Sequence, residues 1–167
     1  MAILEILQYP DTRLNIPAKR VEKIDAAARK LIEDMAETMY AANGVGLAAT
    51  QVDVHKQIII IDVSEDKSDL RVFVNPEITR REGIAVNQEG CLSIPGIYDN
   101  VERAESVTVT ALDRNGSRFT LNASGMLAMC IQHEMDHLSG KIFIDYLSEL
   151  KQSRVRAKLK KRQRKAA

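Results

Sequence analysis

The sequence predicts an α+β fold in which short, mostly antiparallel sheets surround a buried central helix. Short β-branched runs occupy the middle of the chain, and apolar residues recur at helical spacing towards both ends. The dipeptide Asn115-Gly116 separates two alternating runs and is the strongest short signal of an antiparallel hairpin. Because strands and helices do not alternate along the chain, a parallel α/β sheet is disfavoured.

The first predicted helix begins after Asp25, a suitable N-cap, and ends at Asn43-Gly44. Between these positions, apolar residues recur on one face, namely Ala28, Leu31, Ile32, Met35 and Met39. The predicted strands that follow are short runs rich in β-branched residues, at 57–63, 71–76, 106–113 and 117–123.

Two further helices are predicted in the last third of the chain. The segment from Ser124 to Gly140 is apolar on nearly every side, so we expect it to be the buried central helix. A third helix starts near Ser148 and continues into a basic tail. We therefore expect residues 1–147 to form the body of a single domain, with 148–167 as its helical extension.

The composition limits the class of protein. A chain of 167 residues that is 45% hydrophobic can bury a core, which excludes disorder of the whole chain. It contains no apolar stretch of membrane-spanning length and no basic leader, so we expect a cytoplasmic protein without membrane partners. Two cysteines, Cys91 and Cys130, are too few for a disulfide framework and are expected to be reduced thiols.

The net charge of +1 conceals a marked asymmetry. Residues 1–150 carry 15 basic and 23 acidic side chains, whereas nine cations and no acidic residue follow position 150. An acidic body with a basic tail indicates chemistry in the body and docking by the tail. The alternative is a solvated charged end that only aids solubility.

The predicted central helix contains His133, Glu134 and His137 in an HExxH pattern. Residues four apart lie about 6 Å apart along one helix face, so both imidazoles can bind one metal ion. Glu134 then lies beside the ion, within reach of a water molecule. A chance pair of histidines is the alternative, but unpaired charge is expensive in so apolar a helix.

Two histidines leave the third ligand open. The extended protease motif HExxHxxGxxH is excluded because Phe143 replaces its third histidine. Glu149 is a weak candidate, because it opens the basic helix. Cys130 lies too far along the axis from His137, so it is expected to line a pocket or fill the core. Cys91 remains, with a buried structural thiol as its alternative role.

A third segment, 44–51, combines two glycines and small residues with a terminal glutamine. A lone GxG is weak evidence for phosphate binding. Small residues followed by Gln51 suit a backbone that closely approaches a ligand, with the amide donating to an oxyanion.

Together, GVGLAATQ, EGCLSIP and QHEMDH resemble the three signature motifs of the peptide deformylases, in that order. The resemblance extends over nearly the whole chain and implies a role for each matching residue. It implies that Cys91, His133 and His137 bind the metal and that Glu134 is the acid–base residue. It further assigns oxyanion stabilisation to Gln51 and the Leu92 N–H, and substrate binding along a strand edge to Gly44, Val45 and Gly46.

The activity implied is removal of the N-formyl group from nascent polypeptides that begin with formyl-methionine, with release of formate. The resemblance implies one divalent metal ion, typically Fe²⁺ in the family, with Zn²⁺, Ni²⁺ or Co²⁺ able to replace it. The ligand types alone favour zinc. In relatives, a basic C-terminal helix docks on the ribosome, which the cations from Lys151 to Lys165 would do without reading a nucleic-acid sequence.

A slot for the methionine side chain is expected beside the metal, formed by Met126, Met129 and Cys130 unless these residues only fill the core. Many relatives carry an arginine near Tyr98, so contacts to later substrate residues are open. Arg103 and Glu89 are expected to form an exposed ion pair, with a pair that supports the metal site as the alternative. Two rival functions are a metallopeptidase with a different third ligand and a ribosome-binding protein without enzymatic activity.

Overall fold

The computed structural model describes residues 2–166 and has the predicted α+β architecture. Three α-helices lie in this part of the chain: α1 (Ala26–Ala41), α2 (Gly125–Leu138) and α3 (Glu149–Ala166). The strands are β1 (Gly46–Ala48), β2 (Ile58–Ile61), β3 (Arg71–Glu82), β4 (Ala85–Cys91), β5 (Ile94–Arg103), β6 (Ser106–Leu112) and β7 (Arg118–Ser124). Short 3-10 helices are η1 (Thr12–Asn15), η2 (Ala49–Val52) and η3 (Phe143–Tyr146).

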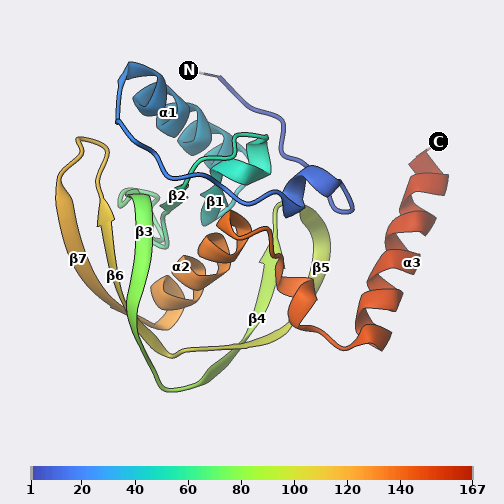
Figure 1. Ribbon diagram of the computed structural model, residues 1–167. Helices are drawn as coiled ribbons and strands as arrows, with labels where there is room; N and C mark the ends of the chain where they lie inside the picture. The colour runs from blue at the N-terminus through green and yellow to red at the C-terminus, as the bar shows by residue number, and fades with distance from the viewer. Residues whose placement is uncertain (1, 167) are drawn as a thin grey trace.

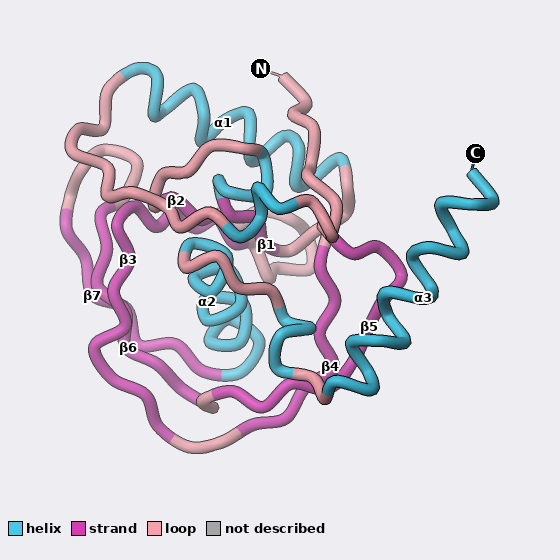
Figure 2. Tube along the Cα trace, turned by 45° about the vertical axis from the view of Figure 1, so that its right-hand side comes forward, coloured by secondary structure: helices cyan, strands magenta, loops and turns pink. Residues whose placement is uncertain are grey.

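The strands form two antiparallel sheets on opposite sides of α2. Five strands are ordered β1-β2-β3-β6-β7, and the hairpin β4-β5 forms a separate two-stranded sheet. Figure 1 shows α2 in the middle of the molecule, with the larger sheet on one side and β4 and β5 on the other. Figure 2 shows the same enclosure after rotation, so α2 is the buried central helix that the sequence predicts.

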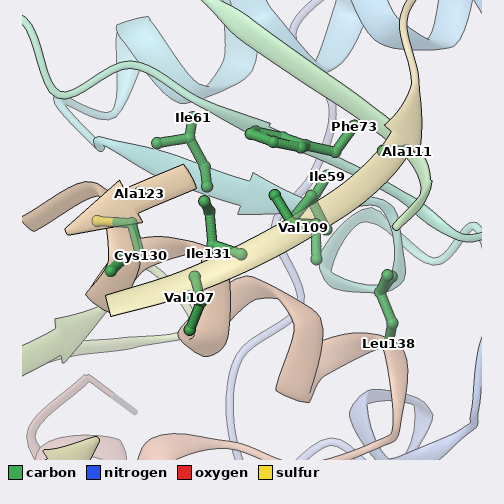
Figure 3. Close-up of a cluster of buried hydrophobic side chains, with 12 residues drawn as sticks. Ile59, Ile61, Phe73, Val107, Val109, Ala111, Ala123, Cys130, Ile131 and Leu138 are labelled. Carbon is green, nitrogen blue, oxygen red and sulfur yellow. The ribbon is translucent and has the colours of Figure 1, made fainter. Parts of the chain in front are cut away.

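The larger sheet is covered on both faces, which explains the continuous apolar run of β2. Ile59 and Ile61 pack in one cluster with Ile131 of α2 (Figure 3). Ile58 and Ile60 lie in a second cluster, which contains the apolar face of α1. All four isoleucines are fully buried because successive strand residues point to opposite faces.

Local signals set the boundaries of several elements. The Asp25 carboxylate accepts a hydrogen bond from the Ala28 N–H and caps α1. Asn43 adopts a positive φ just after this helix. Gly116, at φ +85°, allows the tight turn between β6 and β7.

Three strands lie outside the predicted runs, and β3 continues well beyond residue 76. β1 has only three residues, and β4 and β5 carry many polar side chains because they form a two-stranded sheet at the edge of the molecule. The pattern of alternating burial is therefore weak in these segments.

The basic helix α3 lies against β5 on the outside of the molecule (Figure 1). Val155 is buried in a cluster with Ile94 and Ile97, and Leu159 packs against that cluster. Leu150 is 62% exposed and does not join the contact. No helix within residues 2–166 is long and apolar enough to cross a membrane.

Candidate active site and metal centre

The structure brings three metal-ligating side chains together. Cys91 ends β4, and His133 and His137 lie one turn apart on α2. One ligand atom from each residue lies within 4.8 Å of the other two. Within the described residues this is the only such group of His, Cys, Asp and Glu, so the alternatives Cys130 and Glu149 do not join it.

The donor geometry fits a metal ion. Cys91 Sγ lies 3.4 Å from His137 Nε2. Tetrahedral bond lengths for a zinc-like ion place such a sulfur and nitrogen roughly 3.5 Å apart. The two imidazole rings meet edge to face, with centroids 5.1 Å apart, so both can direct a nitrogen towards one point. The Cys/His/His set therefore suits a divalent transition metal.

The electrostatics of the site also favour a cation. Burial lowers the pKa of His133, but the nearby Glu134 carboxylate and the contacts with Cys91 and Glu89 outweigh it and raise that pKa well above its usual value. Burial lowers the pKa of His137 well below its usual value, and the charge on His133 adds to this effect. The acidic surroundings of His133 therefore stabilise positive charge at the cluster, whereas His137 is held neutral, the form in which an imidazole binds a metal.

The expected exposed ion pair between Arg103 and Glu89 is wrong. Their side chains are only 5% and 1% exposed, and the guanidinium binds both carboxylate oxygens at 2.6 and 2.9 Å. Glu89 also accepts a hydrogen bond from His133 Nδ1 at 2.8 Å, which turns Nε2 towards the cluster. Burial raises the pKa of Glu89, but the hydrogen bonds from Arg103 and His133 outweigh it and lower that pKa.

Glu134 is buried beside the cluster, and burial raises its pKa to about 7. Its Oε1 atom has no hydrogen-bond partner among the described residues. A Cβ atom at Gly46 would lie 2.5 Å from Glu134 Oε2, so the glycine leaves room for this carboxylate. A proton acceptor with a pKa near neutrality therefore faces the cavity in front of α2.

Gln51 lies in η2, directly behind β1, and its Nε2 group donates to Ser93 Oγ at 3.1 Å and to Cys91 Sγ at 3.4 Å. Its Oε1 accepts from the Ala48 N–H at 2.9 Å. These contacts fix the amide beside the sulfur ligand. Ser93 was missed by the sequence reasoning, although it lies two residues after Cys91.

A cavity of about 610 Å³ opens in front of these groups. His137 is fully buried and does not line the cavity, whereas the remaining predicted site residues do. These are Gly44, Val45, Gly46, Gln51, Cys91, Leu92, Met126, Met129, Cys130, His133 and Glu134. Met126 and Val45 are exposed near the cavity, and Cys130 is buried.

Two further residues were missed, Asp136 and Tyr146, which contact Arg103 from the side opposite Glu89. The only signal in the sequence was the acidic residue Asp136 itself, in a helix that is predicted to be buried. Tyr146 carries no signal, because its contact depends on how η3 folds back onto α2.

Comparisons with known proteins identify the family of this chain. The family model described as polypeptide deformylase matches residues 3–153. Peptide deformylase 1 of Burkholderia multivorans is 61% identical over 165 residues, which cover 98% of this chain and 91% of that protein.

Solved structures show the same fold. A peptide deformylase from Legionella pneumophila has a TM-score of 0.94 at 52% identity, covering 98% of this chain and 96% of that one. The peptide deformylase from Ehrlichia chaffeensis in complex with actinonin has a TM-score of 0.94 at 42% identity, covering 98% of this chain and 99% of that one. With a matching family model over most of its length and near-complete relatives at this identity, the chain belongs to the peptide deformylase family.

Proposed function

We propose that this protein removes the N-formyl group from nascent polypeptides that begin with formyl-methionine and releases formate. The observation that carries the proposal is the cluster of Cys91, His133 and His137 behind a cavity that also exposes Glu134. Hydrolysis of a small terminal amide needs these parts: a metal site, a base and a cavity large enough for a peptide end.

The bound metal would supply a Lewis acid that polarises the formyl carbonyl and activates water. The Glu134 carboxylate accepts a proton from the attacking water and returns it to the departing amine. Its unpartnered Oε1 supports this role, since no other group competes for that oxygen in the described structure.

When water attacks the formyl carbon, negative charge develops on the formyl oxygen, which then requires hydrogen-bond donors. Gln51 and the backbone N–H of Leu92 are proposed for this role, because both residues line the cavity beside Cys91. The Gln51 contact to Cys91 Sγ is the longer of its two donor contacts, and sulfur is a weak acceptor. This N–H can therefore turn to the substrate while Ser93 keeps the amide in place.

Two surfaces are proposed to hold the substrate. The backbone of Gly44, Val45 and Gly46 lies along the cavity wall and can pair with an extended peptide. Met126, Met129 and Cys130 lie on α2 in the same cavity and would surround the methionine side chain. Actinonin, present in the structure of the Ehrlichia chaffeensis enzyme, is expected to compete for this cavity.

The metal is proposed to be Fe²⁺ in the native protein, with Zn²⁺, Ni²⁺ or Co²⁺ as substitutes. The family depends on a metal ion, and the Cys/His/His donors are compatible with each of these ions. Peroxide treatment of the iron-loaded protein should oxidise Cys91 before Cys130, because burial raises the pKa of the Cys130 thiol to about 12.

The tail is proposed to dock on ribosomal RNA in the cytoplasm. Residues 1–147 would form the catalytic part, and residues 148–167 the basic extension with the cations from Lys151 to Lys165. Residue 167 and the side chain of Lys165 lie outside the described residues. Val155 anchors α3 to the body, and exposed basic residues such as Lys158, Lys160 and Lys161 point away from that contact. Changing these three lysines to serine should weaken salt-dependent cosedimentation with ribosomes and leave deformylation of free peptides unchanged.

Formate release from formyl-Met-Ala-Ser under anaerobic conditions tests the enzymatic proposal. Activity should disappear with a chelator, return with Fe²⁺, and be lost in Glu134→Ala but retained in Glu33→Ala, an exposed change on α1. Cleavage of unformylated peptides instead would favour a metallopeptidase. Ribosome binding without any metal-dependent hydrolysis would leave only the non-enzymatic function.

A further inference from the structure

We propose that Tyr146, a residue outside the three motifs, is a positioning residue for the metal ligand His133. This inference rests on the metal site of the proposed function. It concerns residues that lie away from the substrate cavity. Tyr146 acts through a chain of three buried or partly buried charged groups, Asp136, Arg103 and Glu89.

The chain of contacts is continuous. The Tyr146 hydroxyl donates to Asp136 Oδ2 at 2.8 Å, and Arg103 Nη1 donates to the same oxygen at 2.7 Å. The other two edge donors of Arg103 reach both oxygens of Glu89. His133 Nδ1 then donates to Glu89 Oε1 at 2.8 Å.

The planar guanidinium of Arg103 couples the position of Asp136 to that of Glu89. A guanidinium is flat, so its paired contacts with Glu89 fix the plane of that carboxylate. Glu89 Oε1 receives both Arg103 Nη2 and His133 Nδ1, and any rotation of the guanidinium therefore moves the acceptor of the imidazole. At the outer end of this chain of contacts, the guanidinium is held by Asp136. The Asp136 side chain is 20% exposed and can turn towards water.

Tyr146 restrains that outer end in two ways. Its hydroxyl holds Asp136, and its ring lies under the guanidinium, with Arg103 Cζ 5.0 Å from the ring centroid. A second cavity of about 460 Å³ opens here, lined by Arg103, Asp136 and Tyr146. Without the ring, water from this cavity would reach a guanidinium that is now nearly fully buried.

The two cavities approach the centre from opposite sides of the network. The lining residues of the second cavity include none of those that line the substrate cavity. A change at Tyr146 should therefore alter metal retention and kcat but not KM. A residue that only stabilised the fold would alter neither metal retention nor the ligand field of the loaded protein.

Tyr146→Phe and Tyr146→Leu test the proposal, with Tyr40→Phe as a matched control. Tyr40 also donates its hydroxyl to a carboxylate, that of Asp62 at 2.6 Å, but lies on α1 and lines neither cavity. Each variant is loaded with Co²⁺, and two measurements are made without substrate: the visible absorption spectrum and the rate of cobalt loss to a chelator. The thermal midpoint of unfolding, kcat and KM are also measured for each variant.

We expect Tyr146→Phe to lose cobalt about 3- to 10-fold faster and to lower kcat by a similar factor at unchanged KM, less than direct partners of a metal ligand cause. Tyr146→Leu should have a larger effect and a shifted cobalt spectrum, whereas Tyr40→Phe should match the wild type in all of these. The proposal is overturned if Tyr146→Phe and Tyr146→Leu both retain the wild-type cobalt spectrum and dissociation rate. The cobalt spectrum and the rate of cobalt loss need no substrate. They therefore test the role of Tyr146 even if the protein does not deformylate peptides.

Discussion

Glu134 and Gly46 lie against each other at the edge of the cavity, and the space that Gly46 leaves is filled by the Glu134 carboxylate. The missing side chain of Gly46 permits the carboxylate to lie beside strand β1, where burial raises its pKa. Gly44 makes a similar approach to a different partner, because a Cβ atom there would lie 2.6 Å from Leu92 Cδ1. The two glycines therefore differ in what a methyl group would disturb.

Gly46→Ala should lower kcat about 10²-fold while the metal remains bound. The new Cβ would push the Glu134 carboxylate away from its position, and misplacement by about 1 Å is enough for such a loss. Gly44→Ala should be milder, because a flexible leucine tip can move. Steady-state kinetics and metal content measure both effects, and equal kcat for the two variants would contradict this assignment.

The ionisation of Glu134 should depend on the metal. In the metal-free protein its pKa is about 7, so the proton-accepting carboxylate is lost as the pH falls below that value. A bound divalent cation favours the carboxylate and should shift the pKa down. Carbon NMR of the carboxyl group, assigned with Glu134→Gln, measures the pKa with and without Zn²⁺. A value near 4.5 in both states would contradict the prediction.

Among the elements, α1 and α2 show how a helix can stabilise the molecule or carry its chemistry. α1 covers the outer face of the larger sheet through Met35 and Met39. α2 lies between the two sheets (Figure 1). Its two histidines form the metal-ligand cluster with Cys91 of β4. A change at an end of α1 should therefore affect stability without affecting catalysis.

Asp25→Ala should lower the free energy of unfolding, since it removes the cap on the Ala28 N–H. Asp25→Ser retains a capping oxygen and should recover most of the loss. Urea unfolding measures the change, and kcat/KM should stay at the wild-type value for both variants. A large loss of activity in Asp25→Ala alone would show that α1 does influence the site.

For the whole molecule, the metal site joins parts that the backbone connects only loosely. Cys91 belongs to the two-stranded sheet, and both histidines belong to α2. An ion held by all three would fasten the hairpin β4-β5 to the core. Arg103 adds a second connection of the same kind, because it leads from β5 to Asp136 of α2.

Metal removal should therefore lower the thermal midpoint. If the free metal concentration is about 1,000 times its Kd, binding contributes about 4 kcal/mol, which corresponds to roughly 10 °C in a protein of this size. Cys91→Ser should melt near the metal-free wild type and respond weakly to added Zn²⁺. Calorimetry with and without a chelator measures this, and unchanged midpoints would argue against the three-ligand site.

The elements that can be predicted from the sequence are those whose signals are local. The Asp25 cap, the turn at Gly116 and the four-residue spacing of His133 and His137 each depend on neighbours within a few positions. Physical interactions at that range act before the chain is folded, so the pattern of residues is sufficient to predict them. Cys91 could be selected by elimination and by resemblance, but not placed.

The tertiary structure alone decided what lies next to what. It brought Cys91 to a helix residue 46 positions away, buried Arg103 between two carboxylates and placed Tyr146 beside Asp136. The physical reason is that the exposure of a charged side chain depends on which distant segments cover it. Residue type sets the energy of burying a charge, but only the fold supplies the partners that compensate for it.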